Sequence, residues 1–97
     1  MLTVFRSRLR DENRGAYDAT AARMDELART MPGFVDFKTF TADDGERVSI
    51  IEFDSAEHQA AWRRHPEHAE AQRRGRAELY ESYDLSVCEV IRRSRFP

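Results

Sequence analysis

Hydrophobic and polar residues alternate between Leu2 and Leu9, in a stretch that contains several good β-formers. This period of two predicts a β-strand, which is followed by a polar connection over Arg10–Arg14. Apolar residues then recur at steps of three and four, which is the spacing of one side of an amphipathic helix. The segment "MPG" at Met31–Gly33 is expected to end this helix. The residues of this stripe are Tyr17, Thr20, Ala21, Met24, Leu27, Ala28 and Met31.

Three further strands are predicted. Phe34–Thr41 and Glu46–Phe53 are joined by "ADDG", in which Asp44-Gly45 is typical of a tight hairpin because both residues tolerate positive φ. Asp84–Ile91 has the composition of a final strand, and "RRSRFP" follows it as a short tail. The chain therefore carries four strands in all.

A broken helix is predicted between the third and fourth strands. Asp54, with Glu57 three residues later, has the pattern of a capping box, so we expect the helix to begin at Ser55. Pro66 disfavours helical geometry at the residue before it and suits the first position of a new helix. We therefore expect a break there and a further helix to about Tyr80.

This order of elements predicts an α+β, ferredoxin-like split βαβ fold, in which helices cover one face of a four-stranded antiparallel sheet. The strands are nevertheless apolar on both faces, and helices can cover only one. We expect the other face to be buried in a homodimer whose two sheets face each other. The opposed residues are Phe34 and Phe40 against Val35 and Phe37, Val48 and Ile50 against Ile51 and Phe53, and Leu85, Val87 and Ile91 against Cys88 and Val90.

The composition is that of an ordinary soluble protein. The 97 residues are enough for a single domain, 1–97, and they are 40% hydrophobic and 35% charged with a formal net charge of -2. Without a basic excess we expect no nucleic-acid partner, and without a long apolar run or a cleavable leader we expect no membrane contact and a cytoplasmic location. The only cysteine, Cys88, excludes an intramolecular disulfide and a thiolate zinc framework.

The richest stretch for chemistry is "AWRRHPEHAEAQRRG", which holds the only tryptophan and two of the three histidines. Trp62 can line an aromatic pocket or fill a core, and a histidine can act as a base, a metal ligand or a helix cap. We expect no metal site, because a divalent ion requires three or four ligands with carboxylate or thiolate support and no HExxH pairing occurs here. His65 fits a helix C-cap, whereas His68 lies in a first helical turn that disfavours a cation, so it is a candidate neutral base.

Several other features leave two interpretations open. Tyr80 and Tyr83 can donate to a substrate oxygen or pack with wet hydroxyls. Gly75 lowers the stability of a helix by about 1 kcal/mol relative to Ala, which indicates close approach of another backbone or of a ligand. The arginines of "AQRRGR" fit a solvated helix face better than an anion site. No glycine-rich phosphate loop or nucleophile elbow is present, so kinase, nucleotide and hydrolase functions are not indicated.

The segments "FRSRL", "MPGF", "IIEFDSAE", "AWRRHPEHAEAQRRGR" and "LYESYDLSVCEVIR" together resemble the antibiotic biosynthesis monooxygenase family of dimeric α+β barrels. The resemblance spans nearly the whole chain. It implies a homodimer with one pocket per subunit between sheet and helices. It also implies oxidation of a small aromatic, polyketide or quinol-type substrate by O₂, without a metal or flavin cofactor.

The resemblance also implies roles for particular residues. His68 or His65 would be the base, Trp62 and Phe5 would form pocket walls, and Tyr80 or Tyr83 would donate to a substrate oxygen. The residues expected to bind substrate are Phe5, Ser7, Trp62, Gln72, Tyr80 and Tyr83.

Two alternatives stay open. The haem-degrading branch of the family has an Asn on strand one and a haem-ligating His ten residues beyond the Trp. Here those positions hold Ser7 and Gln72, so haem degradation is not expected unless His65 or His68 takes over ligation. The other alternative is a non-catalytic barrel that holds a small hydrophobic ligand, because a fold alone does not fix an activity.

Overall fold

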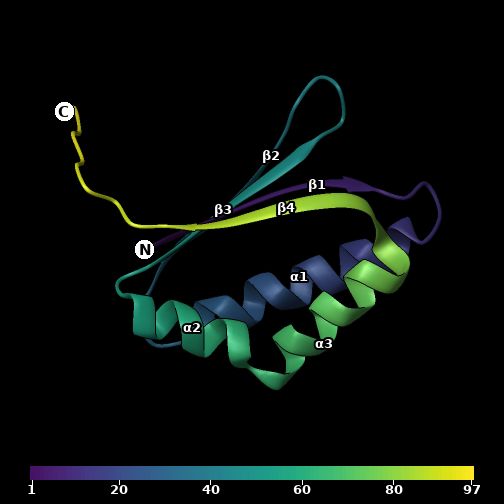
Figure 1. Ribbon diagram of the computed structural model, residues 1–97, viewed down its shortest axis with the longest axis horizontal. Coiled ribbons are helices and arrows are strands. Elements are labelled where there is room, and N and C mark those ends of the chain that lie inside the picture. Colours follow the sequence, from purple (N-terminus) through teal and green to yellow (C-terminus); the bar gives the residue numbers. More distant parts are fainter.

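The computed structural model describes residues 1–97, with an antiparallel sheet of four strands and all the helices on one of its faces (Figure 1). The strand order β2-β3-β1-β4 confirms the predicted ferredoxin-like split βαβ arrangement, because β3 lies between the two strands that α1 connects. The elements are β1 (Leu2–Leu9), α1 (Arg14–Thr30), β2 (Phe34–Thr41), β3 (Arg47–Phe53), α2 (Ala56–Arg64), α3 (Pro66–Arg74), a π-helical turn η1 (Gly75–Leu79) and β4 (Tyr80–Cys88).

The connection from α1 to β2 depends on a glycine. Gly33 has a φ of 78°, a conformation that side-chain-bearing residues rarely adopt. A Cβ atom at this position would also collide with the side chains of His58 and Asp54. The predicted helix stop at "MPG" is thereby confirmed, and the same glycine lets the start of α2 approach the end of α1.

The cap of α2 differs from the prediction. The Ser55 side chain accepts a hydrogen bond from the backbone N–H of His58 (3.1 Å), so Ser55 is the N-cap and the helix begins one residue later. Ser55 is extended, with φ -152° and ψ 162°, as a capping residue must be. Asp54 instead bonds the imidazole of His58 (2.5 Å). The capping-box prediction was therefore one residue out of register, whereas the break before Pro66 is confirmed.

The last helix and strand also have different limits from those predicted. α3 ends at Arg74 and continues as the π turn, and β4 begins at Tyr80 rather than Asp84 and ends at Cys88 rather than Ile91. The reason is pairing: β4 follows β1 along its whole length, from Leu9 opposite Tyr80 to Leu2 opposite Cys88. The partner strand therefore sets the length of β4, which its own residue pattern did not show.

An irregularity in β2 changes which side chains share a face. Phe34 pairs with Phe53, but the next paired residue of β2 is Asp36, so Val35 is an extra residue. A bulge of this kind reverses the alternation on one side of it. Phe34 and Phe37 consequently both pack against the core beneath the helices, although simple alternation had placed them on opposite faces.

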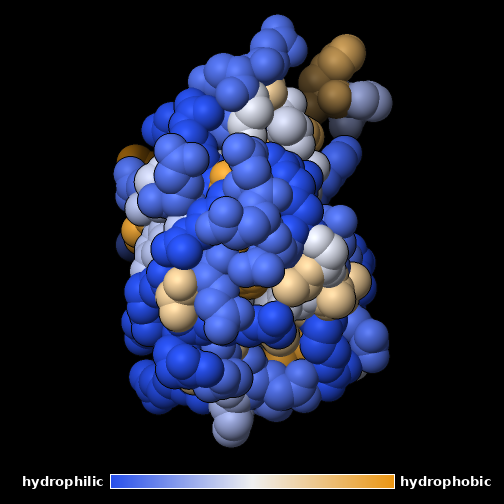
Figure 2. Space-filling view, turned by 90° about the vertical axis from the view of Figure 1, so that its right-hand side faces the viewer, coloured by the Kyte–Doolittle hydropathy of each residue, from blue (hydrophilic) through white to orange (hydrophobic).

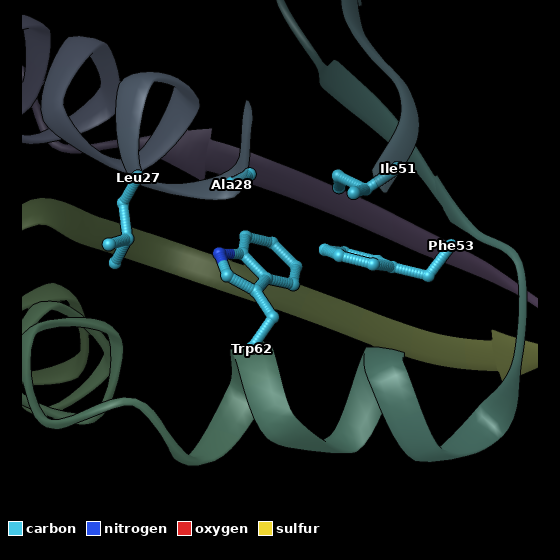
Figure 3. Packing of buried hydrophobic residues seen from close by; sticks show 5 residues of the cluster. All are labelled: Leu27, Ala28, Ile51, Phe53 and Trp62. Carbon is cyan, nitrogen blue, oxygen red and sulfur yellow. The ribbon is translucent and has the colours of Figure 1, made fainter. Parts of the chain in front are cut away.

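The main core cluster joins β3 to two helices. Figure 3 shows the indole of Trp62 projecting from α2 toward α1 and the sheet, with Phe53 beside its six-membered ring. The Trp62 and Phe53 ring centroids are 5.5 Å apart, and both residues are buried. The buried residues of this cluster are Leu27, Ala28, Ile51, Phe53 and Trp62, and those of a second cluster are Leu9, Tyr17 and Leu79.

The sheet face opposite the helices is uncovered (Figure 1). Phe40 is 49% exposed and Ile50 is 36% exposed, and strand pairing places the half-buried Val48 and Val4 beside them. Apolar side chains on both faces are therefore confirmed. The end of the molecule with the β1–α1 connection, by contrast, has a largely hydrophilic surface (Figure 2). None of the helices has the length and apolar character needed to cross a bilayer.

Replacement of Phe53 tests the main core. Phe53→Ala removes a ring with 0% exposure that contacts Phe34 and Trp62. We expect the free energy of unfolding to fall by about 3–5 kcal/mol, measured by urea denaturation at fixed protein concentration. Phe96→Ala is the matched control, because that ring is fully exposed and its loss should change stability by less than about 0.5 kcal/mol. Equal effects of the two substitutions would contradict this assignment of the core.

Candidate functional site

A cavity of about 500 Å³ lies between the helices and the sheet, with walls from all four strands and from α1, α2 and α3. This volume is within the usual range of small-molecule sites, about 300–1,000 Å³. The fold brings six of the residues predicted from sequence into its lining, but Ser7 and His65 are outside it. The six lining residues are Phe5, Trp62, His68, Gln72, Tyr80 and Tyr83.

The imidazole of His68 is stacked on the indole of Trp62, with ring centroids 4.2 Å apart and planes inclined by 20°. Its Nδ1 lies 3.2 Å from the backbone carbonyl of Arg63, which can only accept a hydrogen bond. Nδ1 therefore carries the proton, and Nε2 is left as the basic atom of the neutral ring. Burial lowers the pKa of His68 below its ordinary value of 6.5. His68 is thus neutral at pH 7, the state that a general base requires.

The position of His68 follows from the break at Pro66. His65 closes α2 and caps α3, where its Nδ1 accepts a hydrogen bond from the backbone N–H of Glu67 (3.2 Å). The predicted C-cap role of His65 is confirmed, and its ring is engaged in capping rather than directed to the cavity. Because α3 starts in a new direction, His68 in its first turn lies back over Trp62.

No group of three or more His, Cys, Asp and Glu side chains in the structure could hold a metal ion. The third histidine, His58, bonds Asp54 and does not line the cavity.

The indole N–H of Trp62 is buried without an acceptor, and it is the only buried side-chain nitrogen or oxygen atom in this state. Figure 3 shows the nitrogen on the edge of the ring away from Phe53. A buried donor without a partner costs about 1–3 kcal/mol, so native structures rarely keep one without a reason. Trp62 lines the cavity, but this N–H is itself closed to water, so an acceptor oxygen of a bound molecule would reach it only after a neighbouring side chain moves.

Phenol rings form a second wall near the start of β4. Tyr80 contacts Phe5 edge-on at a centroid distance of 5.3 Å, and Tyr17 and Tyr83 lie 6.1 Å and 5.8 Å from it. Burial raises the pKa of Tyr80 above its ordinary value, so its hydroxyl keeps its proton and can donate a hydrogen bond. This wall is aromatic with a polar edge, as expected for a planar ligand.

Gly75 makes room for this wall. A Cβ atom on Gly75 would lie 2.5 Å from the ring of Tyr80, which no ordinary packing allows. Gly75 opens the π-helical turn, an irregularity often found at functional sites. The close approach that a glycine in a helix indicated is therefore to an aromatic side chain of the same site.

Four of the polar or aromatic lining residues that sequence reasoning missed are Thr3, Tyr17, Arg47 and Gln59. Two form a buried hydrogen bond, from Nε2 of Gln59 to Oγ1 of Thr3 (3.2 Å). Tyr17 had been assigned to the helix stripe, and the guanidinium of Arg47 lies 5.1 Å from the centre of its ring. The alternation of β3 held a signal for Arg47, because it shares the inward face with Ile51 and is charged where an apolar residue is expected.

Comparison with known proteins gives consistent results. The profile of the family described as antibiotic biosynthesis monooxygenase matches residues 1–74, which include Trp62 and His68 but not Tyr80 and Tyr83. YqjZ of Bacillus subtilis, an uncharacterized protein, is 37% identical over 93 residues, which are 96% of this chain and 82% of that relative.

Solved structures share the fold. Rv0793 from Mycobacterium tuberculosis has a TM-score of 0.84 at 18% identity, with 97% of each chain covered. A crystal structure of an antibiotic biosynthesis monooxygenase has a TM-score of 0.78 at 14% identity, with 95% of this chain and all of that chain covered. These structural similarities confirm the α+β fold. The family profile and YqjZ are in addition similar to this chain in amino-acid sequence. The chain therefore belongs to the antibiotic biosynthesis monooxygenase family.

Proposed function

We propose that this protein is a cofactor-independent monooxygenase that oxidises a hydroxylated aromatic, polyketide or quinol-type substrate. The observation that carries the proposal is the state of His68: its Nδ1 is held by a backbone carbonyl, its ring is neutral, and it lies in a cavity with aromatic walls. Such chemistry asks the protein for a base, a planar binding surface and exclusion of water. Membership of the monooxygenase family supports the same reaction class.

The proposed reaction begins when Nε2 of His68 takes the proton of a substrate hydroxyl. The resulting anion passes one electron to O₂, and the substrate radical and superoxide combine to form a C–O bond. The protonated His68 returns its proton to the peroxide, and loss of the C–H proton with cleavage of the O–O bond then releases water and leaves a carbonyl at that carbon. The substrate thus loses an O–H and a C–H hydrogen, one oxygen atom enters the product, and the other leaves as water.

The other cavity groups have roles that fit this sequence. The unpartnered N–H of Trp62 would bind an acceptor oxygen of the substrate, and the hydroxyl of Tyr80 would donate to a second oxygen. Donors aimed at oxygens stabilise the anion that forms after proton transfer. The planar walls of Phe5, Tyr80 and Tyr83 would hold the ring system.

The two alternative functions have weaker support. Gln72 lines the cavity at the position where the haem-degrading branch has its histidine, and an amide is not an axial iron ligand. A barrel that only binds a ligand needs no general base, so this function would not explain why His68 is neutral with its proton on Nδ1.

The functional unit that we propose is a homodimer formed through the uncovered sheet face. The exposed Phe40 and Ile50 form one apolar area with Val4 and Val48, on a face that no helix covers. A chain of 97 residues has a small core, so burial of this area in a two-fold contact adds stability. The resemblance to the family implies the same assembly.

Substitution of His68 tests the base. With an anthrone as substrate, we expect His68→Ala to lower kcat about a hundredfold, the scale of general-base loss, in an oxygen-electrode assay. His65→Ala is the matched control: it should cost about 1 kcal/mol of stability as a lost helix cap and leave kcat nearly unchanged. Full turnover by His68→Ala would show that another group removes the proton.

The lowered pKa of His68 has its own consequence. Protonation removes the base, so kcat/KM should be level at neutral pH and fall only below pH 6.5. Stability should change in the same direction. As the pH drops from 6.5 toward the pKa of His68, the unfolded chain takes up a proton that the folded chain does not, so the free energy of unfolding decreases. His68→Ala should reduce this slope in urea titrations at several pH values, and an unchanged slope would contradict the assigned burial effect.

Light scattering tests the dimer. The wild-type protein should show twice the chain mass of 11.3 kDa at micromolar concentration. Ile50→Glu places a charge at the centre of the proposed contact and should shift the equilibrium to the monomer. Ala69→Glu, on the exposed surface of α3, is the control and should remain dimeric. A monomeric wild-type protein would refute the assembly.

A further inference from the structure

Three arginines of the chain are half-buried, and two of them have evident partners. Arg8 forms an ion pair with Asp44 (2.8 Å), and Nε of Arg10 donates to the backbone carbonyl of Tyr80 (3.1 Å). Arg47 makes neither an ion pair nor a side-chain hydrogen bond in the structure. Its guanidinium lies over the Tyr17 ring, 5.1 Å from the ring centre, and its charge also acts on the phenol of Tyr80, whose pKa it lowers against the larger effect of burial.

The contact with Tyr17 leaves the hydrogen-bonding capacity of Arg47 unused. A guanidinium over an aromatic ring interacts through its flat face, whereas its five N–H donors lie in the plane of the group and point outward at its edges. The Arg47 nitrogens are not among the buried unpartnered atoms of the protein, so they stay open to solvent. A guanidinium that lines the cavity without a protein acceptor is free to bind an acceptor on a ligand.

Arg47 lines the same cavity as Trp62 and His68, but at a distance from them. The residues of β3 that line the cavity are Arg47, Ser49 and Ile51, and Ile51 belongs to the core cluster of Trp62. The four steps along the strand from Arg47 to Ile51 span about 13 Å, at roughly 3.3 Å per residue. Arg47 and the strand position that packs in the Trp62 cluster are therefore well separated along β3.

Acidic side chains in the lining do not neutralise this cation. Asp25 is paired with Arg29 on its own helix (2.7 Å). Asp18 is exposed and is in none of the ion pairs of the protein. Lys38 also lines the cavity, and its ammonium lies over the ring of Phe40 (5.4 Å). An anion that enters the cavity would thus find Arg47 without a competing carboxylate within ion-pair distance.

We propose that the ligand of this cavity is an elongated aromatic carboxylate, whose carboxylate group is bound by Arg47. The planar fork of a guanidinium matches the two oxygens of a carboxylate, which is why arginine rather than lysine suits this role. The ring system would then extend along the aromatic walls toward Trp62 and His68. That the far end carries the reacting hydroxyl rests on the proposed function, whereas binding of the carboxylate rests only on the geometry of Arg47.

Paired neutral and charged probes test the inference. Trp62 is the only tryptophan and lines the cavity, so quenching of its fluorescence reports ligand binding. Anthraquinone-2-carboxylate and anthraquinone-2-carboxamide share a ring system and differ mainly in charge. We expect the wild-type protein to bind the carboxylate at least about tenfold more tightly than the amide, as for a hydrogen-bonded ion pair.

The variants separate a specific contact from general charge. Arg47→Gln should abolish the preference for the carboxylate, and Arg47→Lys should restore part of it. Arg64→Gln removes the same charge from the exposed surface of α2, outside the cavity lining, and should keep the full preference. Circular dichroism of each variant confirms that the fold is retained before binding is compared.

The outcomes distinguish this inference from the proposed reaction. Equal binding of the two probes, no binding of either at millimolar concentration, or a preference that survives in Arg47→Gln would overturn it. A preference that depends on Arg47, in a protein that consumes no O₂ with hydroxylated aromatics, would support the carboxylate site and refute the oxygenase. Turnover that depends on His68, with no preference between the two probes, would support the oxygenase and refute the carboxylate site.

Discussion

The burial of Trp62 between α2 and the sheet is the contact on which both the core and the cavity depend. One part of the indole packs against Phe53 and the end of α1, and a face of it carries the stacked imidazole of His68. The same side chain therefore fixes the helices on the sheet and orients the proposed base. The reversal of the chain at Pro66 makes this possible, because a continuous helix would carry position 68 away along the axis of α2.

Three residues that line the cavity have polar groups without a hydrogen-bond partner in the protein. The N–H of Trp62 has no acceptor, Nε2 of His68 forms no recorded hydrogen bond, and the guanidinium of Arg47 has only an aromatic ring beside it. In most proteins such groups are satisfied within the structure, and isolated exceptions are costly. Of the three, only the N–H of Trp62 is closed to water, and in the proposed function a ligand would complete the bonding of all of them.

The aromatic wall shows how backbone irregularity supports this arrangement. The π turn ends at Leu79, which is buried in the second core cluster, and the next residue, Tyr80, starts β4 with its ring against Gly75. A regular helix followed by a loop would not bring the ring to this position. Tyr80 thus belongs to the strand by its backbone and to the cavity by its side chain.

The sequence by itself determined the order of the elements, the ferredoxin-like topology and the break at Pro66, because periodicity and turn residues are local signals. It also singled out Trp62, His68, Tyr80 and Tyr83 as candidates, whereas Phe5 and Gln72 were expected in the lining only from the resemblance to the family. Pairing with β1 decided the limits of β4, and an extra residue in β2 decided the face of Phe34, since both depend on a partner strand. The tertiary structure also removed His65 and Ser7 from the lining and added Arg47 and Gln59 to it. Which way a side chain faces, and which polar atoms find partners, is fixed by neighbours distant in sequence, and no local pattern encodes them.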